Sequence, residues 1–215
     1  MKLYVMRHGE TTWNTQWRLQ GSSDTHLNEN GREMAAKTGK GLKDIRFDLC
    51  FTSPLHRARE TAELVLGDPK IPIIADERLR EISFGEWEGK STKGPNSPIP
   101  RDMLYCFFHK PEDYIPPKGG ESLESLCHRT GMFLEEVISN PENRDKNILI
   151  TSHGCAARGV MQKVYGNTGL ADFWHGTTPP NCSMCVVEVN NGSMQLLEED
   201  VIYYECDSLP EYVIE

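Results

Sequence analysis

An arginine and a histidine follow directly after the first hydrophobic segment of the chain. Residues 3–6 are large and apolar with no breaker among them, a pattern that predicts a short buried strand. Arg7 and His8 come at its carboxyl end, and His153 comes directly after a second predicted strand over residues 147–152. Ligands of open α/β sheets bind outside the carboxyl ends of the strands. We therefore expect the two histidines, each followed by glycine, to face one another across a single crevice.

Strand and helix patterns alternate through most of the chain, which favours a mostly parallel sheet with helices on both faces. Further strands are predicted over residues 47–52 and 71–74, and Pro72 places the latter at a sheet edge. Residues 183–189 and 194–197 predict a β-hairpin that adds at least one antiparallel strand. Helices are predicted over residues 28–45, from Ser53 onward, from residue 120 onward and over about 156–165.

Two of these helices have recognisable starts. Asn28 is a typical N-cap for the first, although Gly39 and Gly41 weaken the helical pattern that follows it. Ser53 and Pro54 predict the start of the second helix, with serine as the cap and proline at the first helical position.

The length of 215 residues favours one domain, so residues 1–215 are expected to form a single catalytic domain. Between about residues 90 and 120, six prolines punctuate a short aromatic segment from Tyr105 to Phe108. We expect this segment to be an excursion over the active site that contains one helix. Its aromatic side chains either form an apolar pocket wall or pack beneath the excursion.

Composition argues against several classes of protein. The formal net charge of −9 disfavours nucleic-acid binding, which usually needs a basic surplus. No apolar run approaches the roughly 20 residues of a membrane-spanning helix, and Arg7 comes too early for a signal peptide. Seven scattered cysteines do not suggest a disulfide framework. We expect a cytoplasmic protein with reduced thiols and neither a membrane nor a nucleic-acid partner.

The residues at the predicted strand ends suit transfer of a phosphoryl group from a small phosphorylated substrate. His8 is the candidate nucleophile, because a neutral imidazole nitrogen attacks phosphorus and nearby arginines disfavour its protonation. Arg7 and Arg57 are candidate phosphate-binding residues, since a guanidinium matches phosphate oxygens in geometry. His153 can donate a hydrogen bond to a phosphoryl oxygen as charge develops there.

A carboxyl group is also needed, to protonate the leaving oxygen and then to activate water. Glu81 is the candidate for this role. Cys182 and Cys185 have the spacing of a zinc or redox pair, but no second pair matches it, and the histidines outside the candidate site show no metal-ligand spacing. Neither a metal nor another cofactor is therefore expected. The other glutamates that compete with Glu81 are Glu10, Glu86, Glu88 and Glu121.

An ordered set of short motifs resembles the histidine phosphatase superfamily, the phosphoglycerate mutase-like proteins, over residues 1 to about 200. The set comprises Arg7-His8-Gly9-Glu10 with Asn14, Gln20-Gly21, Ser53-Pro54-Leu55 with Arg57-Ala58, Glu81 with Phe84-Gly85 and Trp87-Glu88-Gly89, Gly120-Glu121-Ser122, and Ser152-His153-Gly154. The resemblance implies a three-layer α/β/α sandwich and metal-independent chemistry.

The same resemblance implies roles for individual residues. His8 would form a phosphohistidine intermediate, Glu81 would act as acid and base, and Arg7, Arg57 and His153 would complete the phosphate pocket. The implied substrate-binding positions are Asn14, Gln20, Gly21 and Gly154.

The chain is more similar to the small phosphatases of this superfamily, including the α-ribazole and broad-specificity types, than to the mutases. Mutases typically carry an arginine directly after the catalytic glutamate, where this chain has Ile82. They also have an insertion with paired arginines, where this chain has only Arg101 and Lys110. Three alternatives stay open: a cofactor-dependent phosphoglycerate mutase, a catalytically weak phosphate-binding member of the fold, and a metal-dependent hydrolase.

Two further features have more than one interpretation. Trp13 and Trp17 flank Asn14 and are expected to hold their loop in place rather than to stack on substrate. The acidic, aromatic tail over residues 201–215 either packs as a final strand or reaches a second subunit in a homodimer.

Overall fold

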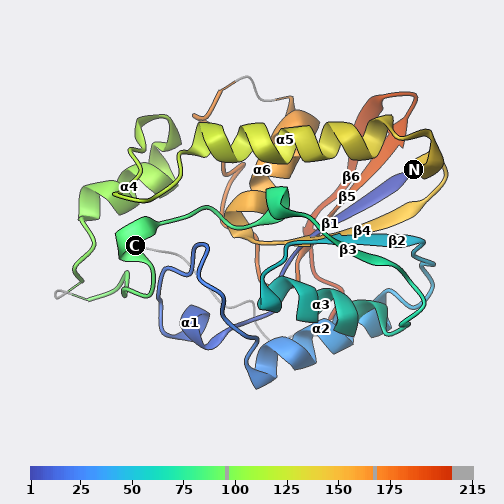
Figure 1. Cartoon of the computed structure of the whole chain (residues 1–215), viewed down its shortest axis with the longest axis horizontal. Coiled ribbons are helices and arrows are strands. Elements are labelled where there is room, and N and C mark those ends of the chain that lie inside the picture. The colour runs from blue at the N-terminus through green and yellow to red at the C-terminus, as the bar shows by residue number, and fades with distance from the viewer. Residues whose placement is uncertain (95–96, 167–168, 205–215) are drawn as a thin grey trace.

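The computed structural model describes residues 1–94, 97–166 and 169–204. A six-stranded sheet with the order β3-β2-β4-β1-β5-β6 lies between two layers of helices (Figure 1). The strands are β1 (Lys2–Arg7), β2 (Leu49–Thr52), β3 (Ile73–Ala75), β4 (Asn147–Ser152), β5 (Met184–Asn190) and β6 (Ser193–Val201). Strands β3, β2, β4 and β1 are parallel, and β5 pairs antiparallel with β1. The predicted three-layer sandwich with an antiparallel strand in a mostly parallel sheet is confirmed.

Helices cover both faces of this sheet (Figure 1). The longer helices are α2 (Glu29–Gly41), α3 (His56–Leu66), α4 (Arg101–His109), α5 (Leu123–Ser139) and α6 (Gly154–Tyr165). The short ones are α1 (Thr12–Thr15) and the 3-10 turns Glu77–Leu79, Gly85–Trp87, Pro111–Asp113 and Pro141–Asn143.

Strand β1 is buried on both faces, which explains its unbroken apolar sequence. Leu3 and Val5 belong to the cluster of apolar side chains that packs under α5 and α6. Tyr4 and Met6 point to the opposite face and belong to the cluster under α2 and α3. The two helical layers are therefore held by alternate side chains of the same central strand.

Helix α2 is shorter than the predicted span of residues 28–45. Asn28 caps it as expected, since its side-chain oxygen accepts from the Gly31 amide at 2.8 Å. At Gly39 a Cβ atom would lie 2.5 Å from the Val65 carbonyl oxygen. The glycine that weakens the helical pattern thus allows α2 to approach α3 closely.

The predicted start of α3 at Ser53 and Pro54 is wrong. The helix begins at His56, and Leu55 precedes it without a side-chain capping bond. A carboxylate from another loop caps the first turn instead, since Asp24 Oδ1 accepts a hydrogen bond from the His56 amide at 2.8 Å. The Ser53 hydroxyl lies among the site residues described below.

The other predicted elements agree with the structure. Strand β3 is at the sheet edge, and β5 and β6 form the expected hairpin. Ser122 caps α5 by accepting from the Ser125 amide at 3.2 Å. Helix α4 is the helix within residues 90–120. The tail predicted over residues 201–215 is described only to Tyr204, and residues 205–215 lie outside the described residues.

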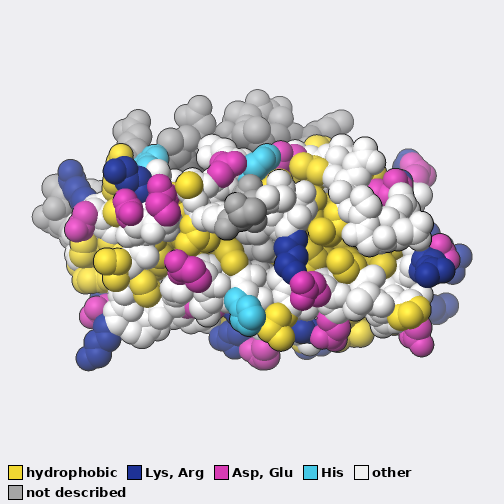
Figure 2. All heavy atoms as spheres, turned by 90° about the horizontal axis from the view of Figure 1, so that it is seen from above, with side chains coloured by type: hydrophobic (Ala, Val, Ile, Leu, Met, Phe, Trp, Pro, Cys, Tyr) yellow, Lys and Arg dark blue, Asp and Glu magenta, His cyan; other side chains and the backbone are white. Residues whose placement is uncertain are grey.

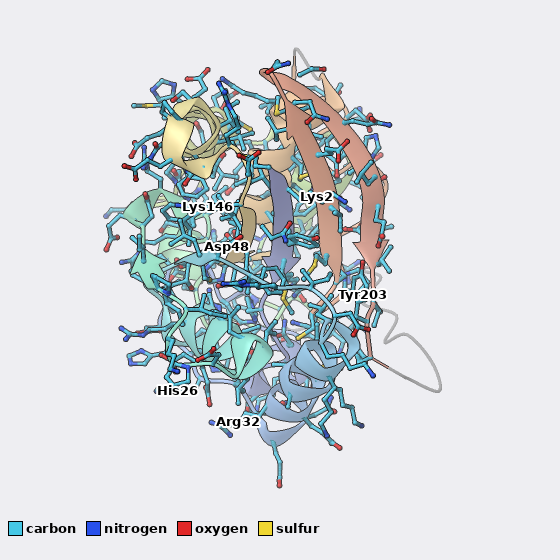
Figure 3. All side chains as sticks on the ribbon, turned by 90° about the vertical axis from the view of Figure 1, so that its right-hand side faces the viewer. Lys2, His26, Arg32, Asp48, Lys146 and Tyr203 are labelled. Carbon is cyan, nitrogen blue, oxygen red and sulfur yellow. The ribbon has the colours of Figure 1, made fainter. Side chains whose placement is uncertain are left out.

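The start of β1 lies beside the start of β4, because the Lys2 amide donates to the Lys146 carbonyl at 2.9 Å (both labelled in Figure 3). The two strands are parallel, so their carboxyl ends meet at the other side of the molecule, toward α1 and α4 in Figure 1. On the face in Figure 2, charges of both signs are interspersed. Within the described ranges no helix is long and apolar enough to cross a membrane.

Candidate active site

The two predicted strand-end histidines lie side by side. Arg7 at the end of β1 is in register with Ser152 at the end of β4. The His8 amide continues this pairing by donating to the Ser152 carbonyl at 2.9 Å. The rings of His8 and His153 have centroids 5.2 Å apart, but of the two only His8 lines the pocket at this edge of the sheet, and His153 is fully buried.

The imidazole of His8 is oriented by its own loop. Its Nδ1 lies 2.6 Å from the Gly9 carbonyl oxygen, which can only accept, so Nδ1 carries the proton and Nε2 keeps a lone pair. Burial lowers the pKa of His8 well below 6.5, and the charges of Arg57 and Arg7 lower it further. The ring is therefore neutral at pH 7, with an unprotonated Nε2.

The guanidinium of Arg57 connects the two histidines. Its Nε lies 3.3 Å from His8 Nε2 and 3.1 Å from His153 Nδ1. Its terminal nitrogens donate to the carbonyl oxygens of Gly21 and Ser23, both at 2.7 Å. Burial lowers the pKa of Arg57 to about 10, which leaves it cationic at pH 7. The site therefore holds a fixed positive charge beside the His8 imidazole.

His153 is fully buried behind this arginine. Its Nε2 lies 2.7 Å from the Ser53 hydroxyl, and its Nδ1 accepts from Arg57. Burial, followed by the charge of Arg57 and the neighbouring His8, lowers the pKa of His153 well below 6.5. His153 is thus a neutral imidazole with its proton on Nε2, directed to serine.

The carboxylate of Glu81 is bound to the first turn of α6. Its two oxygens accept from the amides of Cys155 at 3.1 Å and Ala156 at 2.9 Å. A third bond comes from the adjacent Ile82 amide at 3.0 Å. Amides at a helix N-terminus favour an anion, so this geometry fixes the position of the carboxylate beside the pocket that contains His8.

The glutamates that compete with Glu81 have other surroundings. Glu10 accepts from the side-chain amides of Asn28 and Asn30. Glu121 makes two bonds to Arg129, at 2.7 and 2.8 Å. Glu81 lines the pocket that contains His8, whereas Glu10, Glu86, Glu88 and Glu121 do not.

Glu88 has a supporting position. Its carboxylate accepts from the Ser22 amide at 2.9 Å and from the Ser23 hydroxyl at 2.5 Å. Burial alone would raise the pKa of Glu88, but hydrogen bonds from Ser23, Ser22 and Phe84 outweigh burial and lower it. Glu88 therefore holds the loop whose carbonyl groups bind Arg57.

A pocket of about 130 Å³ opens over His8. All four predicted substrate-binding positions line it, namely Asn14, Gln20, Gly21 and Gly154. The side-chain oxygen of Asn14 accepts from the Thr11 amide, and the Gln20 oxygen accepts from the Thr11 hydroxyl, both at 3.0 Å. Because these oxygens are engaged, the amide nitrogens are the groups that can donate to an anion.

Arg7 and Gly154 lie together at the base of this pocket. Arg7 donates to the Pro179 carbonyl at 2.5 Å and is 8% exposed. A Cβ atom at Gly154 would lie 3.2 Å from the Thr178 methyl group and 3.7 Å from Arg7 Nε. Glycine at this position thus allows the Thr178 methyl group to approach the start of α6 closely, and Arg7 lies in van der Waals range of the same point.

Several lining residues were not assigned to the site from the sequence. Trp13 and Trp17, expected to hold their loop rather than to contact substrate, line the pocket, and so does Trp174. Phe107 and Phe108 line it as well, which agrees with the pocket-wall alternative for their segment. Two cations, Arg101 and Lys110, lie in the stretch where mutases have paired arginines. Both are exposed, and neither lines the pocket that contains His8. Among the described residues, no group of three or more histidine, cysteine or acidic side chains is arranged to hold a metal ion.

The family model of the histidine phosphatase superfamily (branch 1) matches residues 3–200 of the chain. The chain belongs to this superfamily. A 2,3-bisphosphoglycerate-dependent phosphoglycerate mutase from Methylobacterium sp. (strain 4-46) is 34% identical over 184 residues, which cover 81% of this chain and 87% of the mutase. An uncharacterized phosphatase, PhoE, from Bacillus subtilis (strain 168) is 33% identical over 162 residues, which cover 75% of this chain and 76% of PhoE.

The fold of this histidine phosphatase superfamily member also matches solved structures. YhfR of Bacillus stearothermophilus superposes with a TM-score of 0.85 at 33% identity, over 95% of this chain and 99% of YhfR. Superfamily membership together with phosphatase relatives classifies the chain as a phosphatase.

Proposed function

We propose that the protein is a metal-independent phosphomonoesterase that hydrolyses a small phosphorylated metabolite through a phosphohistidine on His8. The observation that carries this proposal is the contact between His8 and Arg57. Nε2 of the neutral His8 imidazole lies 3.3 Å from Nε of the buried Arg57 guanidinium. A nucleophile and a phosphate-binding cation therefore meet at one point, at the base of an open pocket.

In the first step, His8 Nε2 attacks phosphorus and the bond from phosphorus to the ester oxygen breaks. Arg57 and Arg7 balance the charge on the phosphoryl oxygens. Glu81, in its protonated form, gives its proton to the departing alkoxide, which leaves as an alcohol. Hydrogen bonds from the first turn of α6 then stabilise the carboxylate that Glu81 becomes.

In the second step, the Glu81 carboxylate removes a proton from water. The water oxygen attacks phosphorus, the bond from phosphorus to Nε2 breaks, and inorganic phosphate forms. His8 returns to its neutral state and Glu81 to its acid form, so the cycle closes without a metal or another cofactor.

Two alternatives predict different products. A cofactor-dependent phosphoglycerate mutase returns the phosphoryl group to a second hydroxyl of phosphoglycerate, and a phosphate-binding member of the fold releases nothing. Ile82 after Glu81, and the exposed positions of Arg101 and Lys110, support hydrolysis over the mutase reaction.

The test is a substrate panel, with a chelator present throughout, on the wild type and on His8→Ala. The panel contains p-nitrophenyl phosphate, sugar phosphates, α-ribazole phosphate, and 3-phosphoglycerate with and without bisphosphoglycerate. We expect the wild type to release phosphate and His8→Ala to release none. An acid-labile phosphoryl group on a His8-containing peptide after a rapid quench identifies the intermediate.

Each other result points elsewhere. Isomerisation of 3-phosphoglycerate without phosphate release assigns the mutase reaction, and activity lost in chelator assigns a metal-dependent hydrolase. Phosphate release that persists in His8→Ala rejects the phosphohistidine route.

A further inference from the structure

Glu81 lies on a segment of the chain that has no regular helix or strand. Residues 80–83 come between the 3-10 turns Glu77–Leu79 and Gly85–Trp87. The backbone of this segment is therefore not held by the hydrogen-bond ladder of a sheet or by the bonds within a helix. Its position depends on the groups of other elements that bind its carbonyl oxygens.

Arg129, in the second turn of α5, binds the part of the chain that leads into this segment. Its Nη1 donates to the carbonyl oxygens of Arg78 and Arg80, both at 2.7 Å. The Leu79 carbonyl between them accepts from the Ser152 hydroxyl at 2.9 Å. Side chains from α5 and β4 therefore bind all three carbonyl groups that precede the glutamate.

The guanidinium of Arg129 is itself fixed by Glu121. Its Nε and Nη2 donate to the two carboxylate oxygens at 2.7 and 2.8 Å, and the two side chains are only 20% and 19% exposed. The Glu121 amide donates to the Ser83 carbonyl at 2.9 Å, so this residue binds the segment after Glu81. The pair has no net charge, so it adds no uncompensated cation near the carboxyl group that must be protonated in the first step.

We infer that Arg129, paired with Glu121, is a positioning residue for Glu81 and acts by fixing the backbone on both sides of it. The glutamate must reach the ester oxygen in the first step and water in the second. A displacement of about 1 Å is enough to cost about 10²-fold in rate. The inference rests on the proposed phosphomonoesterase activity, in which Glu81 is the acid and the base.

A purely structural role of Arg129 predicts a different pattern of losses. If the arginine only stabilised the fold, its removal would lower the amount of folded enzyme, and all substrates would lose activity by the same factor. If it positions the acid, the loss depends on how much the leaving group needs a proton. Two esters that differ in this need therefore separate the two roles.

The test measures kcat and KM for n-propyl phosphate, whose alkoxide needs protonation, and for p-nitrophenyl phosphate, whose leaving group needs it less. The variants are Arg129→Met, Arg129→Lys and Glu81→Gln. The matched control is Arg78→Met, because the Arg78 side chain also pairs with two carboxylates, those of Asp76 and Glu136, rather than with the backbone beside Glu81. Circular dichroism checks that each protein is folded.

We expect Arg129→Met to lower kcat for n-propyl phosphate by on the order of ten- to a hundredfold, and kcat for p-nitrophenyl phosphate by much less. Arg129→Lys should show a smaller difference of the same sign, since lysine lacks the fork that binds two carbonyl groups and a carboxylate together. It decides the test if Arg129→Met does not fold. Inhibition by inorganic phosphate should stay at the wild-type level, because His8 and Arg57 are unchanged. Added to Glu81→Gln, Arg129→Met should not change the ratio of the two kcat values further.

Equal losses on both esters in the Arg129 variants, or the same unequal loss in Arg78→Met, would overturn the inference and leave the phosphatase activity standing. Equal losses in Glu81→Gln would overturn it together with the acid role of Glu81. If the wild type releases phosphate from neither ester nor from any member of the substrate panel, the proposed function fails and the inference with it.

Discussion

The hydroxyl of Ser53 lies 2.7 Å from Nε2 of His153, and both residues are fully buried. Because His153 Nδ1 accepts from Arg57 at 3.1 Å, the serine fixes the tautomer that keeps the Arg57 Nε–H directed to the histidines. A residue that the sequence predicts as a helix cap thus orients a ring of the active site.

Replacing Ser53 by alanine should loosen this arrangement. Ser53→Ala leaves the buried Nε2–H of His153 without its acceptor, which costs about 1–3 kcal/mol of stability. We expect kcat to fall as well, because Arg57 loses one fixed neighbour. Urea unfolding and steady-state kinetics measure the two effects. The control is Ser139→Ala at the exposed end of α5, and a Ser53→Ala enzyme as stable and active as this control contradicts the assignment.

Stability should fall as the pH drops below the ordinary histidine pKa of 6.5. Burial and the charge of Arg57 hold the pKa of His8 and of His153 well below this value in the folded protein. Below pH 6.5 the unfolded chain therefore binds protons that the folded protein does not bind. The free energy of unfolding then decreases toward the folded pKa, by at most about 1.4 kcal/mol per pH unit for each histidine.

Urea unfolding between about pH 7.5 and pH 5.5 measures this slope. His8→Asn removes one of the two contributing groups, so its stability should fall less steeply than that of the wild type. Parallel pH profiles for the two proteins would mean that His8 is protonated in the folded state as readily as in the unfolded chain.

Much of the fold is predictable because its signals are local. The apolar run of β1 and the polar residues after it identify a central parallel strand and the position of the site. The start of α3 has no local sequence signal, because the His56 amide donates to the side chain of Asp24, which lies in a different loop. Likewise Gly39 looks unfavourable in a helix until the approach of Val65 is known.

The residues of the site likewise divide into those with a local sequence signal and those placed by distant contacts. His8 directly follows β1, and Arg57 lies in the first turn of α3, the helix after β2. The topology therefore brings them to the same edge of the sheet. The aromatic side chains that line the pocket are placed by contacts between distant segments, such as the hydrogen bond from Trp174 Nε1 to the Phe107 carbonyl. Residues 170–180 have no regular helix or strand in the structure, and no periodic pattern marks their place. The sequence therefore indicates the chemistry of the site more fully than the shape of its pocket.

Glu81→Gln should separate acid catalysis from folding. Glutamine keeps one oxygen that can accept from the Ala156 amide, but its NH2 group would face the Cys155 amide, which is also a donor. We therefore expect a folded protein that is less stable by about 1–3 kcal/mol. Loss of the proton donor lowers kcat by about 10²–10⁴ for an alkyl phosphate. The loss should be smaller for p-nitrophenyl phosphate, whose leaving group needs less protonation. Glu86→Gln, at an exposed position on the same segment, is the control. Equal losses on both substrates argue that Glu81 is not the acid.

Glu88 should act on the reaction only through Arg57. Its carboxylate holds Ser22 and Ser23, and the Ser23 carbonyl accepts from Arg57 at 2.7 Å. Glu88→Gln should therefore let the guanidinium shift and lower kcat/KM by about tenfold, since small displacements of a phosphate-binding group are costly. In an Arg57→Lys background, which lacks the guanidinium held by this loop, the same substitution should have a much smaller effect.

A double-mutant cycle with kcat/KM for p-nitrophenyl phosphate measures this coupling. Circular dichroism of all four proteins checks that each is folded. If Glu88→Gln lowers kcat/KM by the same factor in both backgrounds, the two residues act independently, and the route from Glu88 through the Ser22–Ser23 loop to the phosphate-binding arginine is wrong. A smaller factor in the Arg57→Lys background places Glu88 as a positioning residue for that arginine.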